Sequence, residues 1–452
     1  MSAVLSSAQP RAASRPQALS RAGQLFLAVF IIVVYEGAVR KWVSSAASLP
    51  LVGLRDLCAA ALILYAWKRG YLRQHMKITA AMFAWSLLVF GWGLLQLAGG
   101  ESSPIIFIIG LRFWLLYTWF AIAAAASMNE ADYRAALLTA AWMMILMAPL
   151  AVLQHYSPPG ARINAQLDSD DEEGIFVAVV GVVRTTGTFS FTSGYATFMA
   201  LVAPVVFGLL SARKPRTRHY LFATVVFIAF LTGALVSGSR TAVISSGTMF
   251  MAYLLGRLLF SRMQQKPAAA VGVIMALLLV GIFAIFFRDA IDVTQTRFEQ
   301  ASEAEDFWSR VQIILVGEPH VFDTVNWLGG GVGFGSNLAN FVRTGSSGYF
   351  ALAESEGGRI LLEGGLLGFF YVGLKLIVIA IGLFKSFRLS MKTHSPFPVL
   401  VWLIAALAIM TWPSSGQLTA HGLLGIIFAF ALLLFRFPRL ELFPGRASKS
   451  KT

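Results

Sequence analysis

The chain has 452 residues, of which 57% are hydrophobic and 13% charged, with a mean hydropathy of +0.71. Soluble domains carry roughly 25% charged residues, so this composition excludes that class and predicts a protein embedded in a bilayer. Basic residues exceed acidic ones by 14, an excess that follows membrane topology rather than a nucleic-acid surface. The single cysteine, Cys58, excludes an internal disulfide, and the six scattered histidines predict no metal site.

The first 23 residues are polar and rich in Ser, Ala and Arg, which predicts a disordered cytoplasmic segment over 1–23. The apolar run that begins near Gln24 has the length of a secretory signal. Glu36, Arg40 and Lys41 follow it before any small-residue cleavage site, so we expect a retained first span.

Apolar runs near the roughly 20 residues needed to cross a bilayer recur along the whole chain. They predict an all-α polytopic membrane protein with about twelve transmembrane helices and a large periplasmic loop before the tenth. Nine helices are expected within 24–287, with an outer loop near 155–191. Three more are expected within 361–437, after the large loop 288–360 and before a basic cytoplasmic tail, 438–452. The runs begin near Gln24, Leu51, Ile78, Pro104, Ala135, Thr192, Tyr220, Thr241, Pro267, Leu361, Pro396 and Thr419.

The connections between these runs alternate in charge. Those assigned to the cytoplasm hold 23 of the 36 basic residues and only three of the 22 acidic ones. By the positive-inside rule, both termini face the cytoplasm and the two long loops face outward.

Two arginines lie where outer segments meet spans. Arg184 opens RTTGTFSF, in which Gly187 allows close backbone approach and the hydroxyls can donate to phosphate oxygens. Arg240 lies in the short turn SGSRTA. A cation in the membrane is costly, by roughly 3 kcal/mol near its centre, so it usually meets an anion. We predict that both bind a pyrophosphate; interfacial snorkelling is the alternative.

A third polar group is ESEGGRILLEGGLLG, 354–368, which leads into the predicted tenth span. On a helix, Glu356, Arg359 and Glu363 share one face. We predict that Glu356 and Arg359 are catalytic, as base and anion clamp. An Arg359–Glu363 pair that stabilises a helix end is the alternative.

The large loop holds two further motifs. RFEQASEAEDFWSR, 297–310, predicts an amphipathic outer helix, and its Arg310 is a candidate third pyrophosphate ligand. LGGGVGFGSN, 328–337, resembles a phosphate loop but lacks a preceding strand and a following lysine. We therefore predict a tight turn under the site.

Other charges are interpreted as structural or left open. The acidic run DSDDEE, 168–173, is typical of a solvated loop rather than a cation site. Arg112 and Lys375 lie deeper in their spans. Arg112 could face the same cavity as the other arginines, whereas Lys375 is nearer the cytoplasmic half and is interpreted as structural.

Together these stretches resemble the O-antigen ligase and polymerase family of bacterial envelope glycosyltransferases over most of the chain. The resemblance is carried by Arg184-Thr-Thr-Gly-Thr-Phe, by Ser239-Arg240-Thr-Ala, by GFGSN at 333–337, and by the acid-rich stretch ending Glu363-Gly-Gly-Leu-Leu-Gly. EGAVRKW, 36–42, is similar to a subgroup of exopolysaccharide polymerase-like proteins. Many ligases carry a His-Asn pair before the tenth span. The stretch SSGYFALAESEGGR lacks it, which weakens the ligase interpretation.

The resemblance implies a metal-independent, C-type glycosyltransferase without a cofactor, in the bacterial inner membrane. Such enzymes take a sugar chain from undecaprenyl pyrophosphate on the periplasmic side. A polymerase passes it to the hydroxyl of another lipid-linked repeat unit, whereas a ligase passes it to lipid A core. The resemblance implies that Arg184 and Arg240 bind the pyrophosphate of the donor. It also implies a chain-length regulator as a partner.

The competing class is a lipid-linked oligosaccharide flippase or twelve-span transporter. Transporters usually show two similar halves and binding residues near the midplane. In this chain the halves differ and the polar residues gather in the outer loops, which favours the enzyme. A non-catalytic assembly scaffold is a third alternative.

Overall fold

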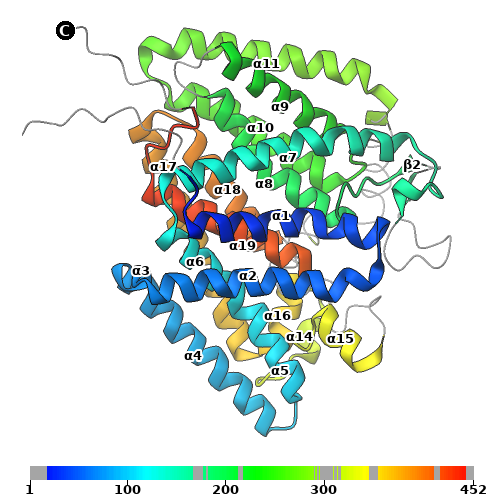
Figure 1. Ribbon diagram of the computed structural model, residues 1–452, viewed down its shortest axis with the longest axis vertical. Helices are drawn as coiled ribbons and strands as arrows, with labels where there is room; N and C mark the ends of the chain where they lie inside the picture. The colour runs from blue at the N-terminus through cyan, green and yellow to red at the C-terminus, as the bar shows by residue number, and fades with distance from the viewer. Residues whose placement is uncertain are drawn as a thin grey trace, which may run out of the picture.

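The computed structural model describes residues 18–165, 177–179, 182–211, 217–289, 317–345, 355–411 and 418–443, with isolated positions between 291 and 313. Within these ranges, eleven helices are long and apolar enough to cross a membrane. A shorter apolar helix occupies the place of the predicted eleventh span. The prediction of an all-α polytopic membrane protein is confirmed, and Figure 1 shows its helices as one bundle.

The helices run back and forth between two ends of the bundle (Figure 1). The long ones are α1 (Arg21–Trp42), α2 (Ser48–Lys68), α4 (Met76–Ala98), α7 (Glu130–Tyr156), α8 (Thr192–Leu210), α9 (Thr217–Leu235), α10 (Arg240–Phe260), α11 (Lys266–Phe286), α17 (Leu366–Thr393), α18 (Phe397–Thr411) and α19 (Leu418–Arg436). Another span is built from α5 (Pro104–Leu111), the π-helical turn η2 (Arg112–Leu116) and α6 (Tyr117–Ser127). Short helices are η1 (Ser45–Ala47), α3 (Tyr71–Gln74), η3 (Arg162–Asn164), η5 (Met263–Gln265), α14 (His320–Thr324), α15 (Asn337–Thr344) and α16 (Glu356–Gly364).

A small antiparallel ribbon lies within the predicted outer loop near 155–191. It pairs β1 (Val177–Val179) with β2 (Val182–Val183). These strands were not predicted, because two or three valines are too short a pattern to distinguish a strand from a loop.

The first helix is tied to α7 through its cap. Ser20 Oγ accepts the N–H of Gly23, and the Ser20 N–H and Oγ–H donate to Asp132 at 2.9 and 2.6 Å. Asp132 also completes the capping box of α7 with Asn129. A side chain at Gly23 would meet Asp132 Oδ1 at 2.4 Å, so these two helix starts pack without space between them.

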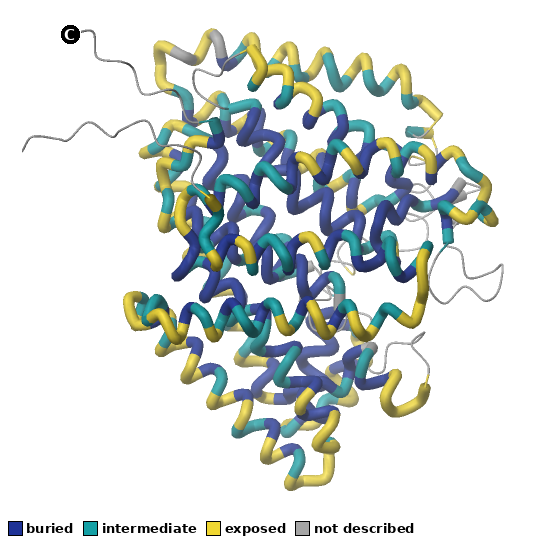
Figure 2. The backbone as a smooth tube through the Cα atoms, in the orientation of Figure 1, coloured by how far each residue is buried: buried dark blue, intermediate teal, exposed yellow. Residues whose placement is uncertain are grey.

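Helix α8 forms the centre of the bundle and α11 its edge. Among the 18 most apolar consecutive residues of each helix, 89% are buried in α8 but only 6% are buried in α11. Figure 2 shows buried backbone concentrated along the middle helices and exposed backbone along α4, α11 and α17. Exposed apolar side chains on these outer helices are what a bilayer solvates.

The described connections that follow α1, α4, α7 and α9 lie at one end of the bundle, here named the loop face. The N–H of Thr185, before α8, donates to Ser237 O in the α9–α10 link at 3.2 Å. On the other side, Gln96 at the end of α4 donates to Leu328 O at 2.6 Å. Segments far apart in the sequence therefore meet at the loop face.

The predicted entry into the tenth span is two helices rather than one. Gly365 separates α16 from α17 with φ 54° and ψ −122°, and a Cβ there would lie 2.2 Å from Trp327 O. A Cβ at Gly368 would lie 2.3 Å from Ile360 O, so α16 folds back tightly against α17. Because Gly365 breaks the helix, the span begins at Leu366, later than the predicted start at 361.

Candidate functional site

The structure brings together the two arginines that the sequence assigns to pyrophosphate. Arg184 lies between β2 and α8, and Arg240 is the first residue of α10. Thr185 joins the two segments, because its N–H and Oγ1 donate to Ser237 O at 3.2 and 3.3 Å. Burial and the nearby charge of Arg240 lower the pKa of Arg184. Two like charges held close at the loop face suit an anion that carries more than one charge.

The segment after Arg184 is fixed by contacts within the protein. Gln154 on α7 accepts the N–H groups of Thr186 and Gly187 at 3.1 and 2.7 Å. Lys41, at the end of α1, donates to Thr186 Oγ1 and Gly187 O, both at 2.8 Å. Gly187 has φ +55°, and a Cβ there would lie 2.6 Å from Met147 Sδ. Internal packing thus accounts for this glycine, and Lys41 ties the segment to α1.

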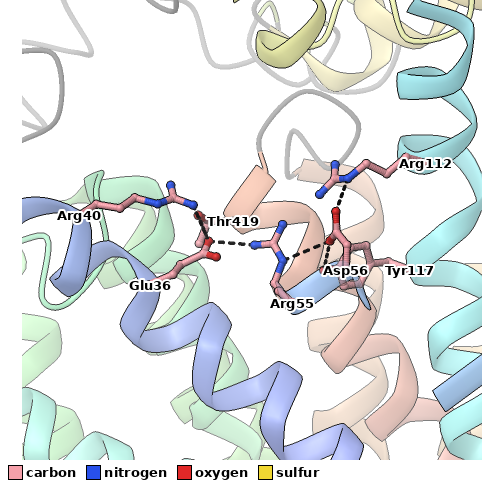
Figure 3. A network of polar contacts seen from close by, with 7 residues as sticks. All are labelled: Glu36, Arg40, Arg55, Asp56, Arg112, Tyr117 and Thr419. Carbon is pink, nitrogen blue, oxygen red and sulfur yellow. Dashed lines mark hydrogen bonds and ion pairs between the residues drawn. The ribbon is translucent and has the colours of Figure 1, made fainter. Parts of the chain in front are cut away.

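A second group of charges is buried between α1, α2 and α19 (Figure 3). Glu36 Oε1 accepts Arg55 Nη1 at 2.8 Å and Thr419 Oγ1 at 2.9 Å, and it lies 3.4 Å from Arg40 Nη2. The exposed fractions of Glu36, Arg40 and Arg55 are 1%, 9% and 0%. This carboxylate therefore holds two guanidinium groups inside the protein.

Asp56 on α2 extends these contacts to the α5–η2–α6 span (Figure 3). Its Oδ1 accepts Tyr117 Oη at 2.8 Å and lies 3.5 Å from Arg55 Nε, while its Oδ2 accepts Arg112 Nε. Arg112 is the first residue of the π-helical turn η2. Single π-helical turns inside α-helices are rare and occur frequently at functional sites.

We name Glu36, Arg40, Arg55, Asp56 and Arg112 the arginine network. Its three guanidinium groups face two carboxylates, which leaves one positive charge in excess. Among the described residues, no hydrogen-bond acceptor meets Arg55 Nη2 or either Nη atom of Arg112, and these atoms are buried. Buried donors are normally paired and an uncompensated buried charge is costly. The network therefore has the charge and the donors of a preformed anion site.

The three charges predicted on one helical face all lie on α16. Glu356 and Arg359 are buried, and Lys375 Nζ on α17 lies 4.0 Å from Glu356 Oε1. Lys375 is thus a neighbour of the predicted base, a contact that the sequence analysis did not anticipate. A Cβ at Gly335 would lie 2.6 Å from Arg359 Cγ, so the glycine-rich stretch packs directly on this arginine.

That stretch also surrounds Glu363. The N–H groups of Gly333 and Gly335 donate to its two carboxylate oxygens at 3.0 and 2.9 Å, and Trp114 Nε1 donates at 3.0 Å. Burial raises the pKa of Glu363 to about 7, against the opposing effect of these donors. Gly331 and Gly333 have φ of 111° and 90°, as a tight turn requires. Since the loop gives these two N–H groups to Glu363, it does not form a phosphate loop.

The span α5–η2–α6 connects the α16 group with the arginine network. A Cβ at Gly110 would lie 2.2 Å from Val332 O, and Trp114 donates to Glu363. Between Gly110 and Trp114 on this span, Arg112 Nε donates to Asp56 on α2, which belongs to the network. Both charged groups therefore flank one helical segment at the loop face.

Some predicted features lie outside the described residues. They are Arg310, which was the third predicted pyrophosphate ligand, Glu354, the acidic run 168–173 and most of the predicted helix 297–310.

Arg40, Arg55 and Asp56 were not predicted as site residues, and Arg112 was predicted as a deeper charge that could face the same cavity as the other arginines. A usable signal was present. Ionisable residues inside a membrane span are rare and usually functional, and Arg55 and Asp56 stand together in an otherwise apolar run. What the signal does not give is the partner of each charge.

The fold and the arginine network define a multi-pass α-helical membrane protein with a cation-rich buried site near its loop face. In the part of the chain that the structure describes, no three His, Cys, Asp or Glu residues are grouped so that they could hold a metal ion. No family model matches the chain, and no curated protein is significantly similar to it.

Proposed function

We propose that this protein is a polysaccharide polymerase of the bacterial inner membrane. It transfers glycan from undecaprenyl pyrophosphate to the hydroxyl of another lipid-linked repeat unit at the periplasmic face. The observation that carries the proposal is the arginine network, in which buried guanidinium donors outnumber their carboxylate partners. Arg184 and Arg240 supply further positive charge at the same face.

The reaction needs mainly charge stabilisation. The acceptor oxygen attacks the anomeric carbon of the donor sugar, the bond from that carbon to the phosphate oxygen breaks, and pyrophosphate leaves with the electron pair. Preorganised guanidinium groups in a water-poor site stabilise the charge that develops on the leaving group. Glu356 is the candidate base that takes the proton of the acceptor hydroxyl, a role worth roughly 10²–10⁴-fold in rate.

The orientation follows the distribution of charge. Basic connections alternate with the loops of the opposite face, which supports a periplasmic orientation of the loop face. Sugar chains linked to undecaprenyl pyrophosphate would then reach the arginines from the outer leaflet.

Mass analysis of undecaprenyl-linked sugars in cells that lack this gene tests the proposal. Single repeat units should accumulate on the periplasmic face and polymer should be absent. Long chains left on the lipid would instead identify a ligase acting on lipid A core. Accumulation on the cytoplasmic face would identify a flippase, and an unchanged lipid-linked pool would contradict any role in glycan transfer.

A further inference from the structure

A groove on the lipid-facing side of the protein leads to the arginine network. It lies between α2 and α4, which diverge from α3 in Figure 1, and its floor is the α5–η2–α6 span. Its volume is about 500 Å³. Arg112 lines one part of the groove, and the remaining lining is almost entirely apolar.

The walls are apolar because their few polar groups are satisfied by each other. Trp119 Nε1 donates to Ser86 Oγ at 2.9 Å, and Ser86 Oγ donates to Met82 O at 2.8 Å. Trp67 and Phe83 contribute exposed rings from α2 and α4. The groove therefore offers carbon surface to an occupant, and Arg112 is the one charged residue in its lining.

The groove extends too deep for a phospholipid chain of the outer leaflet. Arg112 is eight residues into the span that begins at Pro104, about 12 Å below the loop-face end of that span. Asp56, the partner of Arg112, lies eleven residues before Trp67 on α2. Trp67 is therefore about 16 Å further from the loop face than Asp56. One leaflet contributes only about 15 Å of hydrocarbon, so the groove passes the midplane and approaches the opposite interface.

We infer that the α2–α4 groove holds the isoprenoid chain of the lipid-linked donor, with Arg112 bound to the first phosphate of that lipid. This inference rests on the proposed function and adds to it the place and orientation of the lipid. Three observations support it: the depth of the groove, its apolar walls, and the two buried Nη atoms of Arg112 that meet no acceptor among the described residues.

Cross-linking identifies the occupant of the groove. Phe83 is replaced by the photoreactive residue p-benzoylphenylalanine, and the matched control carries the same residue in place of Leu278 on α11. Both positions are about half exposed on a lipid-facing helix, with 51% and 56% of the residue accessible. The helices that carry them, α4 and α11, lie at opposite edges of the bundle (Figure 1). Undecaprenyl phosphate is the probe, in phospholipid nanodiscs. An undecaprenyl adduct at position 83, together with only phospholipid adducts at position 278, is the expected result.

The role of Arg112 is tested by comparing a charged with a neutral lipid. Arg112→Gln should weaken binding of undecaprenyl phosphate about 10- to 100-fold, the equivalent of one hydrogen bond to a charged group. Binding of undecaprenol, which has no phosphate, should not change. A merely structural role of the Arg112–Asp56 pair would weaken both lipids alike and would contradict the assignment of Arg112.

Filling the groove gives a test that leaves the charges intact. The larger side chain of Leu116→Trp should displace part of the lipid chain from the groove. Binding of both lipids should weaken about tenfold for every two methylenes of that chain that are displaced. Leu278→Trp should have no effect. If wild-type protein binds undecaprenyl phosphate but position 83 captures only phospholipid, the groove inference is wrong and the proposed function stands. If wild-type protein does not bind undecaprenyl phosphate at all, both are wrong.

Discussion

Removing Arg55 distinguishes a structural role of the arginine network from a role in anion binding. We expect Arg55→Met to destabilise the protein by about 1–3 kcal/mol, because Glu36 and Asp56 would each lose a contact with a fully buried donor while Arg40 and Arg112 still balance their charges. Methionine retains an unbranched apolar side chain that adapts to the space, so a cavity should contribute little to the loss.

A second substitution separates the two roles. In the double variant Glu36→Gln, Arg55→Met, the carboxylate that Arg55 pairs with at 2.8 Å is neutral. Most of the lost stability should therefore return. Glycan transfer should not return, since the loss of one preorganised donor to a developing anion costs about 10²–10³ in rate.

Stability would be followed as the thermal unfolding midpoint in detergent, using tryptophan fluorescence, and activity as polymer formed from purified lipid-linked repeat units. Arg134→Met is the matched control. Arg134 pairs with Glu130 at 2.7 Å, nearly the same distance, but the two side chains are 21% and 49% exposed, so this pair is worth only about 0–1 kcal/mol. Arg134 Nε also donates to Glu441 O at 2.7 Å, a contact that the control removes as well. Our reasoning about burial fails if Arg55→Met unfolds at the same temperature as Arg134→Met. The anion role fails if the double variant polymerises at the wild-type rate.

Three further results are expected. Arg240→Ala should lower polymer formation at least about 100-fold with membrane insertion unchanged, measured in complemented deletion cells; normal polymer would refute the arginine's role. Gly335→Ala should displace Arg359, which a Cβ would approach to 2.6 Å, and should lower both activity and unfolding temperature, whereas Gly247→Ala, whose Cβ meets nothing within 4 Å, should lower neither. Because burial raises the pKa of Glu363 to about 7, the folded protein keeps a proton that the unfolded chain releases near its ordinary value of 4.5. Stability should thus fall by up to about 3 kcal/mol as pH rises from 4.5 to 7, and Glu363→Gln should remove this slope in unfolding midpoints measured across that range.

The spans and the meeting of two arginines could be predicted from the sequence. Apolar runs of sufficient length allow only helices in a bilayer, so their number follows from hydropathy alone. Arg184 and Arg240 were both assigned to the outer ends of spans, and Thr185 joins the segments that carry them. The break at Gly365 was not predicted, because the pattern of apolar residues from 360 to 370 is the same for one helix as for two.

The position of surplus charge depends on packing and could not be derived from the sequence. Ionisable residues at 36, 55, 56 and 112 are each expensive in a span, but sequence gives no indication of which charges cancel. On α16 the two carboxylates, one arginine and the neighbouring Lys375 sum to zero. In the arginine network, three guanidinium groups from three helical spans meet two carboxylates, and one positive charge remains. No described residue balances this surplus, which is why we propose that the network, as well as the loop-face arginines, binds the pyrophosphate.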